Sequence, residues 1–550
     1  MCGSSPNVGR PASRFRQKGL QFAVALILGA LTAGGFLPGC RRANVAASDQ
    51  VLRLSQRNEP GDLDPATAGL PDDFFIIRAL SEGLLLPASK GAPQPAAAER
   101  FTVSGDGLTY TFQLRPEAKW SNGDPVVAAD FISSYRRVLD PATAAPKADL
   151  FFPVKSARAF ATGALRDFSQ VGFSSPSAHT LVIQLEQPTP RFPDLVATGP
   201  WIPVHPATVA KFGRDWTRPG NHVGNGPFTL VEWRPQQRIV VRRNSRYHRV
   251  NAIRLEEIQF LRFDSGDTEE RAYRAGQVDV TMSVPATKLT GYERGRPAEF
   301  HRTPLAETHY LAFNTTRGPL NDPRVRRALA LAIDRDVIVE RLLQGGQLPA
   351  TRMLPPVLRG ASDVGRRPQE FRHDPAEAAR LLAAAGFPAG RGFPKLEVTA
   401  WSPSQSRVLE AVQEMWRRSL GIEAGILVHE LKVHLDTLHT GNYDIGFVAT
   451  LLDWPDGLAL LSAFASESPE NFPHWQNAAF DRALTAARAH GDRPSQERDT
   501  LAAELLLIED APVSPVYFNA RNWLMSPRVR GWQDDPLWTR FYHDVYLETK

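Results

Sequence analysis

The chain has 550 residues, 42% of them hydrophobic and 22% charged, which is the composition of a globular protein of several domains. Its 45 prolines come without excess glycine or low-complexity sequence, which excludes collagen, coiled coils and long disordered regions. The formal net charge is +5, but residues 1–39 hold four basic residues and no acidic one, so the rest carries one net positive charge. A nearly neutral body gives no electrostatic reason to expect nucleic acid as a partner.

The N-terminus has the features of an export signal. Basic residues precede an apolar run over residues 19–37 and then Leu37-Pro38-Gly39-Cys40, the order of an n-region, an h-region and a cleavage site. The ending resembles a bacterial lipoprotein box, which implies a signal peptide over residues 1–39, acylation of Cys40 and a lipidated tether over residues 40–50. A retained transmembrane helix is the alternative, because the run approaches the length needed to span a membrane. Glycines within the run and Pro38 after it favour cleavage.

The first half of the mature chain is predicted to be rich in strands. Apolar and polar residues alternate there with the period of a half-buried strand. The predicted strands cover residues 51–54, 109–114, 180–185, 238–243 and 255–260.

The second half alternates between helices and strands. Asp322-Pro323 predicts an N-cap with proline at the first helical position, and Asp374-Pro375-Ala376-Glu377 a capping box for a helix that stops at Gly386. Strands are predicted at residues 395–400, 422–428 and 445–452, with helices at about 408–420 and 431–439. This β-α-β-α-β order favours an α/β domain with a mostly parallel sheet.

Catalytic and metal-binding motifs are hard to find. His429 and His434 resemble the pair of a zinc protease with one residue too many between them, and five residues of separation put them about 140° apart on a helix. The only cysteines are Cys2 and Cys40, so the mature body past its N-terminal residue has no thiol for a disulfide, a nucleophile or a metal. We therefore expect a binding protein, not an enzyme, with no cofactor and no metal.

One segment points to a ligand. Asp453-Trp454 directly follows the apolar strand predicted at residues 445–452. Ligands of open α/β sheets bind at the carboxyl ends of strands, and an acid beside an aromatic ring suits a cationic group such as an ammonium. The alternative is that Asp453 only caps a turn before Pro455. Asp456, three residues on, is expected to lie outside the site.

Several segments together carry a family resemblance. These segments are residues 57–60, 63–65, 80–84, 112–131, 226–230, 313–335, 381–386 and 515–517. In this order and spacing the chain resembles the oligopeptide-binding lipoproteins of bacterial ABC importers, the family-5 extracellular solute-binding proteins, from about Val51 to the C-terminus.

The resemblance implies a periplasmic-binding-protein-like type II α/β fold of two lobes joined by a hinge, with an extra inserted domain. Lobe I is then discontinuous, over residues 50–71, 192–305 and 521–550. The inserted domain covers residues 72–191 and lobe II residues 306–520.

The resemblance also implies a ligand site. In peptide-binding members an aspartate receives the peptide's α-ammonium group, and Asp453 stands at that position. The peptide main chain pairs like an added strand, here with Asn58, Glu59 and Pro60 from one lobe and Ala449, Thr450 and Leu451 from the other. Side-chain pockets would be lined by Met282, Ser283, Tyr310, Leu431 and Trp454, with His439 nearby.

The chain also departs from the family pattern. Leu431 replaces a pocket tryptophan, Ser133 a pocket tyrosine, and Leu438 and Phe447 replace basic residues that meet the peptide's C-terminal carboxylate. We expect a periplasmic or otherwise extracytoplasmic, lipid-anchored monomer that passes short peptides to ABC permease subunits. Non-peptide cargo (a metal chelate, haem, a sugar or a cell-wall peptide) on the same scaffold, or a chaperone or sensor role without transport, remain the alternatives.

Overall fold

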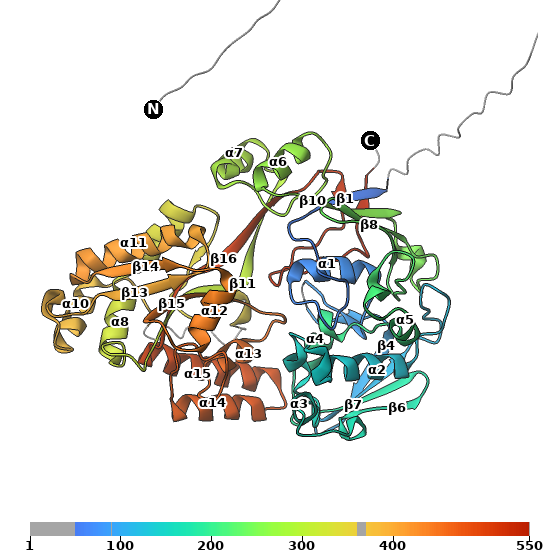
Figure 1. Cartoon of the computed structure of the whole chain (residues 1–550), viewed down its shortest axis with the longest axis horizontal. Helices are drawn as coiled ribbons and strands as arrows, with labels where there is room; N and C mark the ends of the chain where they lie inside the picture. Colours follow the sequence, from blue (N-terminus) through green and yellow to red (C-terminus); the bar gives the residue numbers. More distant parts are fainter. Residues whose placement is uncertain (1–49, 90, 360–369, 549–550) are drawn as a thin grey trace, which may run out of the picture. The chain divides into compact units, whose positions relative to one another are not determined.

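The computed structural model describes residues 50–89, 91–359 and 370–548, and three larger sheets organise them (Figure 1). The first sheet has the order β1-β10-β9-β8. β1 (Val51–Gln56) runs parallel to β10 (Glu257–Arg262), and β9 (Arg238–Arg243) and β8 (Phe228–Arg234) extend the sheet in antiparallel fashion. The strand predicted at residues 255–260 starts two residues late, because the pairing with β1 begins at Glu257.

The second sheet is antiparallel, in the order β4-β5-β7-β6. Its strands are β4 (Ala98–Val103), β5 (Thr109–Leu114), β7 (Thr180–Gln184) and β6 (Phe173–Ser177). Buried and half-buried residues alternate along β5, which confirms the strand predicted there. Helix α2 (Ala128–Leu139) contributes Phe131 and Tyr135 to the core of this sheet.

The third sheet is mixed, in the order β12-β16-β11-β15-β13-β14. β13 (Leu396–Ala400), β14 (Ala424–Val428) and β15 (Ile445–Leu451) are parallel, as predicted. β11 (Phe300–Phe313), β16 (Val513–Leu524) and β12 (Leu348–Pro349) join them in antiparallel fashion. The prediction of a mostly parallel sheet is therefore wrong, because strands distant in sequence complete it.

Polar caps define the helices around the third sheet. Asp322 accepts a hydrogen bond from the backbone N–H of Arg324 at 2.8 Å and begins α8 (Pro323–Leu331). Asp374 accepts one from Glu377 at 2.9 Å and begins α10 (Pro375–Ala384). Gly386 follows α10 with φ +99°, a conformation that favours glycine. α11 (Pro403–Leu420) and α12 (Leu431–His439) complete the predicted unit.

The third sheet has a hydrophobic core on each face. Leu311 and Phe313 of β11 belong to one core, whereas Tyr310 and Ala312 belong to the other. Successive side chains of a strand point to opposite faces, so a strand buried on both faces is apolar throughout its length. The first and second sheets each have a core of their own.

β11 and β16 are the longest strands and lie side by side (Figure 1). Their pairing runs from Phe300↔Leu524 to Ala312↔Val513, and its register shifts between Pro304 and Thr308. A register shift of this kind bends the strands locally.

The remaining elements connect these sheets. They are α1 (Pro71–Leu80), β2 (Leu85–Leu86), β3 (Gln94–Pro95), α3 (Ala157–Ala161), α4 (Phe192–Val196), α5 (Pro206–Phe212), α6 (Gly266–Arg274), α7 (Leu289–Gly295), α9 (Arg335–Val337), α13 (Gly457–Ser462), α14 (Ala478–Ala489), α15 (Arg493–Asp510), β17 (Val529–Arg530) and β18 (Tyr546–Leu547), with short 3-10 and π turns between them.

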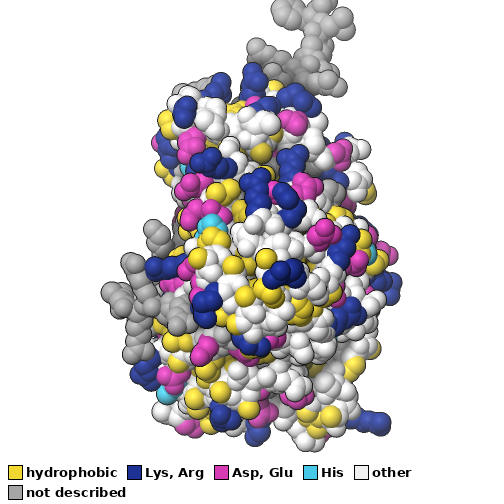
Figure 2. Space-filling model, turned by 90° about the vertical axis from the view of Figure 1, so that its left-hand side faces the viewer, with side chains coloured by type: hydrophobic (Ala, Val, Ile, Leu, Met, Phe, Trp, Pro, Cys, Tyr) yellow, Lys and Arg dark blue, Asp and Glu magenta, His cyan; other side chains and the backbone are white. Residues whose placement is uncertain are grey.

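Charged side chains of both signs are interspersed over the face drawn in Figure 2, as the nearly neutral net charge of the mature chain leads one to expect. No helix of the described residues is long and apolar enough to cross a membrane. The predicted signal, Cys40 and the tether up to residue 49 lie outside the described residues.

Candidate functional site

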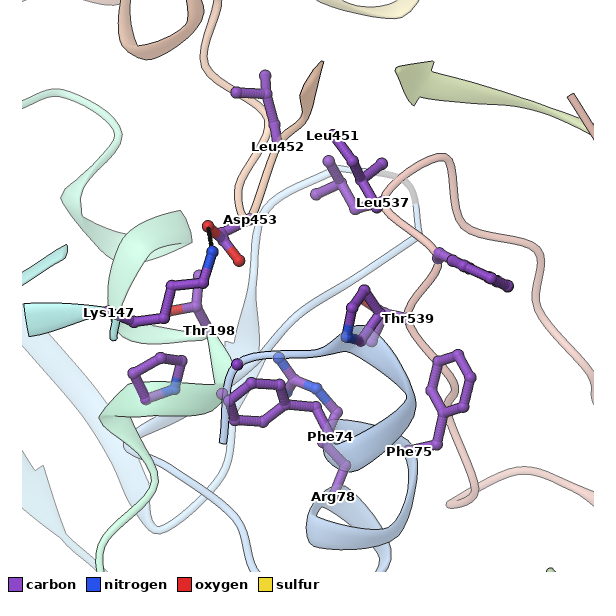
Figure 3. A pocket seen from close by; sticks show the side chains of 15 residues that line it. Phe74, Phe75, Arg78, Lys147, Thr198, Leu451, Leu452, Asp453, Leu537 and Thr539 are labelled. Atoms are coloured by element: carbon purple, nitrogen blue, oxygen red, sulfur yellow. Dashed lines mark hydrogen bonds and ion pairs between the residues drawn. The ribbon is translucent and has the colours of Figure 1, made fainter. Parts of the chain in front are cut away.

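A pocket with a volume of about 150 Å³ lies where five segments meet: α1 with Gly69 just before it, Lys147, residues 198–200, the end of β15 with the two residues after it, and residues 537–539 (Figure 3). Its walls are mainly apolar. They include Phe74, Phe75, Leu451, Leu452, Leu537 and Trp538. The charged groups in the lining are Arg78, Lys147 and Asp453.

Asp453 lies two residues after β15 and forms an ion pair with Lys147. Lys147 Nζ donates to Asp453 Oδ2 at 2.8 Å, and their side chains are 29% and 36% exposed. Lys147 directly precedes a 3-10 turn (Ala148–Phe151) that contributes to the core of the second sheet. Figure 3 shows the two side chains meeting at the edge of the pocket. An alkylammonium group is thus held by Asp453 in this structure.

Arg78 supplies the third charge of the pocket from α1. Its guanidinium donates two hydrogen bonds to the Ala197 carbonyl at 3.2 Å. Burial lowers the pKa of Arg78 to about 10, against the opposing effect of Asp535. Arg78 therefore remains a cation at neutral pH, and the lining carries one net positive charge.

The end of β15 has one unpaired edge. β11 pairs with β15 along its whole length, including Thr450 with Thr308, whereas β13 reaches only Ile445 and Gly446. Among the described residues no strand pairs with the second edge of β15 beyond Gly446. Ala449, Thr450 and Leu451 therefore offer a place for an added strand.

The segment after β1 is held by its own side chains. Asn58 is exposed and donates to Asp72 Oδ2 at 2.9 Å. Glu59 accepts hydrogen bonds from Trp233 Nε1 at 2.6 Å and from the backbone N–H of Gln236 at 3.1 Å. Pro60 is buried. The Glu59 carboxylate therefore fixes this segment to the residues around Trp233 and Gln236.

The predicted pocket residues Met282, Ser283 and Tyr310 lie mostly inside the protein. Met282 is buried in the core of the first sheet, and Ser283 donates to Glu269 Oε2 at 2.9 Å. Tyr310 is buried beside Phe464, and burial raises the pKa of its phenol.

Leu431 and His439 mark the two ends of α12. Leu431 is its first residue, with 48% of its surface exposed. His439 is its last residue and bonds through Nδ1 to the Leu435 carbonyl at 2.8 Å. Trp454 is instead buried in the core of the second sheet. Of the predicted residues, the pocket of Figure 3 brings together only Leu451 and Asp453.

The positions where the chain departs from the family pattern differ in exposure. Leu438 and Phe447 are fully buried in the two cores of the third sheet, and Ser133 is exposed on α2. The histidine pair does not share an element: His429 follows β14, and His434 is buried in α12 against Thr399 and the Phe447 carbonyl. Within the described residues, no group of three or more metal-ligating side chains occurs.

Asp456 has a structural role. Its side chain accepts a hydrogen bond from the Leu458 backbone at 2.9 Å and caps α13. It is buried outside the pocket lining, and burial raises its pKa to about 6 although Arg191 opposes the shift. Asp456, not Asp453, supplies the N-cap of α13.

Comparison with known proteins identifies the fold. A sequence profile of the bacterial extracellular solute-binding proteins, family 5 (middle region), matches residues 92–472. The chain belongs to this family.

Relatives and solved structures agree with the family assignment. The Escherichia coli periplasmic murein peptide-binding protein MppA is 33% identical over 89% of this chain and 91% of its own length. The E. coli periplasmic oligopeptide-binding protein OppA is 32% identical over 94% and 98%. The unliganded open form of MppA matches with a TM-score of 0.77 over 91% of this chain and 98% of that one, at 32% identity. Haemophilus influenzae OppA in complex with RPPGFSPFR matches at 0.78 over 91% and 99%, at 27% identity.

As a family-5 protein, the chain has the α/β fold of two lobes joined by a hinge with an inserted domain, and it belongs to a family of solute-binding receptors. Sequence reasoning missed most of the pocket lining, including Phe74, Arg78, Lys147 and Trp538. Lys147 and Asp453 are 306 residues apart in the chain. No local spacing links them, so only the folded chain reveals their pairing.

Proposed function

We propose that this family-5 protein is an extracytoplasmic receptor that captures peptides by their α-ammonium group and delivers them to an ABC permease. The observation that carries the proposal is the ion pair of Asp453. Lys147 already places a primary ammonium 2.8 Å from this carboxylate at the edge of a mostly apolar pocket. A peptide's α-ammonium has the same charge and donors, so it can replace Lys147.

The cost of this replacement is small. An ion pair between partly exposed side chains contributes only about 0.2–1 kcal/mol, because water screens both charges. A peptide that covers the pocket excludes water from Asp453, and the same charge pair then gains strength. The replacement of Lys147 on Asp453 therefore favours a ligand that also covers the apolar walls of the pocket.

Main-chain pairing supplies the rest of the proposed site. The unpaired edge of β15 at residues 449–451 takes the peptide as an added strand. Asn58, Glu59 and Pro60 are proposed to face it from lobe I, and Leu431 and His439 to border the side-chain pockets. Affinity from main-chain groups makes such a receptor tolerant of peptide sequence.

The domain boundaries expected from the family resemblance remain proposals. The register shift between β11 and β16 supports a position for the hinge. The proposed boundary in β11, at residues 305–306, lies within the register shift between Pro304 and Thr308, and the one in β16, at residues 520–521, lies next to it. We place the hinge there, because an interrupted ladder bends more readily than a regular one.

Native mass spectrometry of the purified protein, before and after mild denaturation, tests the function. We expect a mixture of short peptides to co-purify and to be released on denaturation. A single defined non-peptide mass would overturn the proposal.

A second candidate is an amphipathic cargo that lacks an ammonium. The E. coli relative YgiS is named a probable deoxycholate-binding periplasmic protein and is 32% identical over 88% of this chain. The observation that favours this candidate is the pocket itself, whose walls are mostly apolar and whose lining carries a net positive charge. Saturable binding of an anionic steroid that survives Asp453→Asn supports this candidate over the first.

Lipid anchoring through Cys40 is proposed from the sequence, and we also propose that the mature protein is monomeric. Cys40→Ser should release the protein from membranes without changing its melting temperature. Metabolic labelling with a palmitate analogue checks the anchor, and continued labelling of the variant would contradict it.

A further inference from the structure

Three arginines cluster around Phe75 and Trp538, two aromatic residues of the pocket lining. Arg57 Cζ lies 5.6 Å from the centre of the Trp538 ring, and Arg521 Cζ lies 5.8 Å from it. Arg540 Cζ lies 4.2 Å from the centre of the Phe75 ring, which itself packs edge-on against Trp538. Phe75 and Trp538 both line the pocket, so each of the three guanidinium groups lies next to a residue of this wall.

Within the part of the chain that the structure describes, none of the three arginines has an ion-pair partner. Among the described residues, no carboxylate lies within 4.0 Å of Arg57, Arg521 or Arg540, although many other arginines of the chain have such a partner. Asp534 and Asp535 are the acids whose charges act on Arg521. Asp535 Oδ2 instead accepts the backbone N–H of Thr539 at 2.9 Å. Positive charge therefore exceeds negative charge at this end of the pocket.

Several donors in this cluster are buried without an acceptor among the described residues. Arg540 is 2% exposed; its terminal nitrogens reach the Ser55 carbonyl at 3.4 and 3.5 Å and Met282 Sδ at 2.6 Å, but Nε has no partner. Arg521 Nε and Trp538 Nε1 are also without an acceptor. Buried donors normally find partners, so orphaned donors on adjoining side chains point to a group that the ligand-free protein lacks.

The charges also disfavour one another. Burial lowers the pKa of Arg521 to about 9, and the neighbouring cations Arg540 and Arg57 add to the effect. An anion placed among the three groups relieves this repulsion, and the planar fork of arginine suits a carboxylate.

We propose that Arg57, Arg521 and Arg540, with the indole N–H of Trp538, form an anion subsite that takes a carboxylate of the cargo. The inference rests on the proposed function, and it adds a second charged anchor at the opposite end from Asp453. The cargo is then zwitterionic: an ammonium on Asp453 and a carboxylate, from a C-terminus or an acidic side chain, at the Trp538 end.

The location of Arg521 gives the subsite a second consequence. Arg521 is on β16 and pairs with Thr303 of β11, next to the register shift at Pro304. A carboxylate bound there contacts β16, the segment after β1 and the C-terminal segment at once. Binding at this subsite is thereby coupled to the proposed hinge.

Calorimetric titration of alanine peptides of two to five residues tests the subsite, with each length as the free acid and as the C-terminal amide. In the wild type we expect amidation to weaken binding at least tenfold for the best length. In Arg521→Gln we expect the acid to bind as weakly as the amide, with a ratio below two. Arg57→Gln, at an exposed position, should show a smaller loss in the same direction.

Arg530→Gln is the matched control. It removes one positive charge from the same C-terminal region, where Arg530 is ion-paired with Glu548 at 2.9 Å. The amidation penalty should be unchanged in this variant. Circular dichroism melting of each variant shows that it is folded.

The outcomes separate the two proposals. If the amide binds the wild type as tightly as the acid, the subsite is wrong, while the peptide-receptor function stands. Melting of the wild type and Arg521→Gln with and without sulfate distinguishes a free anion from a cargo carboxylate. If sulfate stabilises the wild type but not Arg521→Gln, while the amidation penalty is the same in both proteins, the site holds a free anion, and its assignment to the cargo is wrong. If neither peptide form binds the wild type at any length, the proposed function fails and the subsite fails with it.

Discussion

At the scale of single residues, Lys147 decides how available Asp453 is to a ligand. The pair is partly exposed, so it contributes about 0.2–1 kcal/mol. Removing the lysine charge in Lys147→Gln frees the carboxylate, and we expect peptide affinity to rise about 1.5- to 5-fold. Calorimetric titration measures the change. A loss of affinity would instead show that Lys147 binds the cargo.

Asp456 gives the chain a pH-dependent loss of stability. Burial raises its pKa from 3.8 to about 6. Between these values the folded protein keeps a proton that the unfolded chain has released, so stability falls as the pH rises from about 4 through 6. Above pH 6 the full cost is on the order of 3 kcal/mol, at 1.36 kcal/mol per pKa unit.

Asp456→Asn tests this cost, because asparagine keeps the helix cap but cannot ionise. The variant should be more stable than the wild type above pH 6, and the difference should shrink to nothing below about pH 4. Urea unfolding at both pH values measures it. Parallel pH profiles of the two proteins would contradict the explanation.

At the scale of elements, the helix caps of the third sheet are the most local features of the fold. Asp374 caps α10 through the Glu377 backbone. Asp374→Ala should therefore cost about 1 kcal/mol, whereas Asp374→Asn should cost little, since asparagine is an equally good cap. Thermal melting of the two variants compares them, and equal losses would show that the cap hydrogen bond is not the cause.

Local signals explain what the sequence predicts well. The caps at Asp322 and Asp374 and the alternation in β13 and β15 need only neighbours in the chain, and these elements were predicted within a few residues. The antiparallel half of the third sheet was missed, because β11 and β16 meet across about two hundred residues of chain. The place of Asp453 after an apolar strand and the family resemblance both indicated this residue, but its partner Lys147 and the arginine cluster depend on distant contacts that no motif marks.

At the scale of the whole molecule, the proposed ligand connects parts of the chain that are far apart in sequence. Asp453 follows β15, whereas α1 and the C-terminal segment supply the facing wall of the pocket. A ligand that binds only the folded protein stabilises it by about 2.7 kcal/mol at a hundredfold excess over Kd. Zwitterionic peptides should therefore raise the melting temperature of ligand-stripped protein by several degrees. Sugars and nickel salts should leave it unchanged; a shift with nickel chelates alone would favour the metal-chelate alternative.

The central claim is that Asp453 binds the α-ammonium group of a peptide, and a double-mutant cycle tests it most directly. Calorimetry would compare wild type and Asp453→Asn, each with a free peptide and its N-acetylated form, with Asp436→Asn on the exposed surface of α12 as the matched control. Breaking a buried charge pair costs about 3–5 kcal/mol, or roughly 10²- to 4 × 10³-fold in Kd. We predict this loss for acetylation in the wild type and the control, and almost none in Asp453→Asn. An equal penalty for acetylation in all three proteins would contradict the claim.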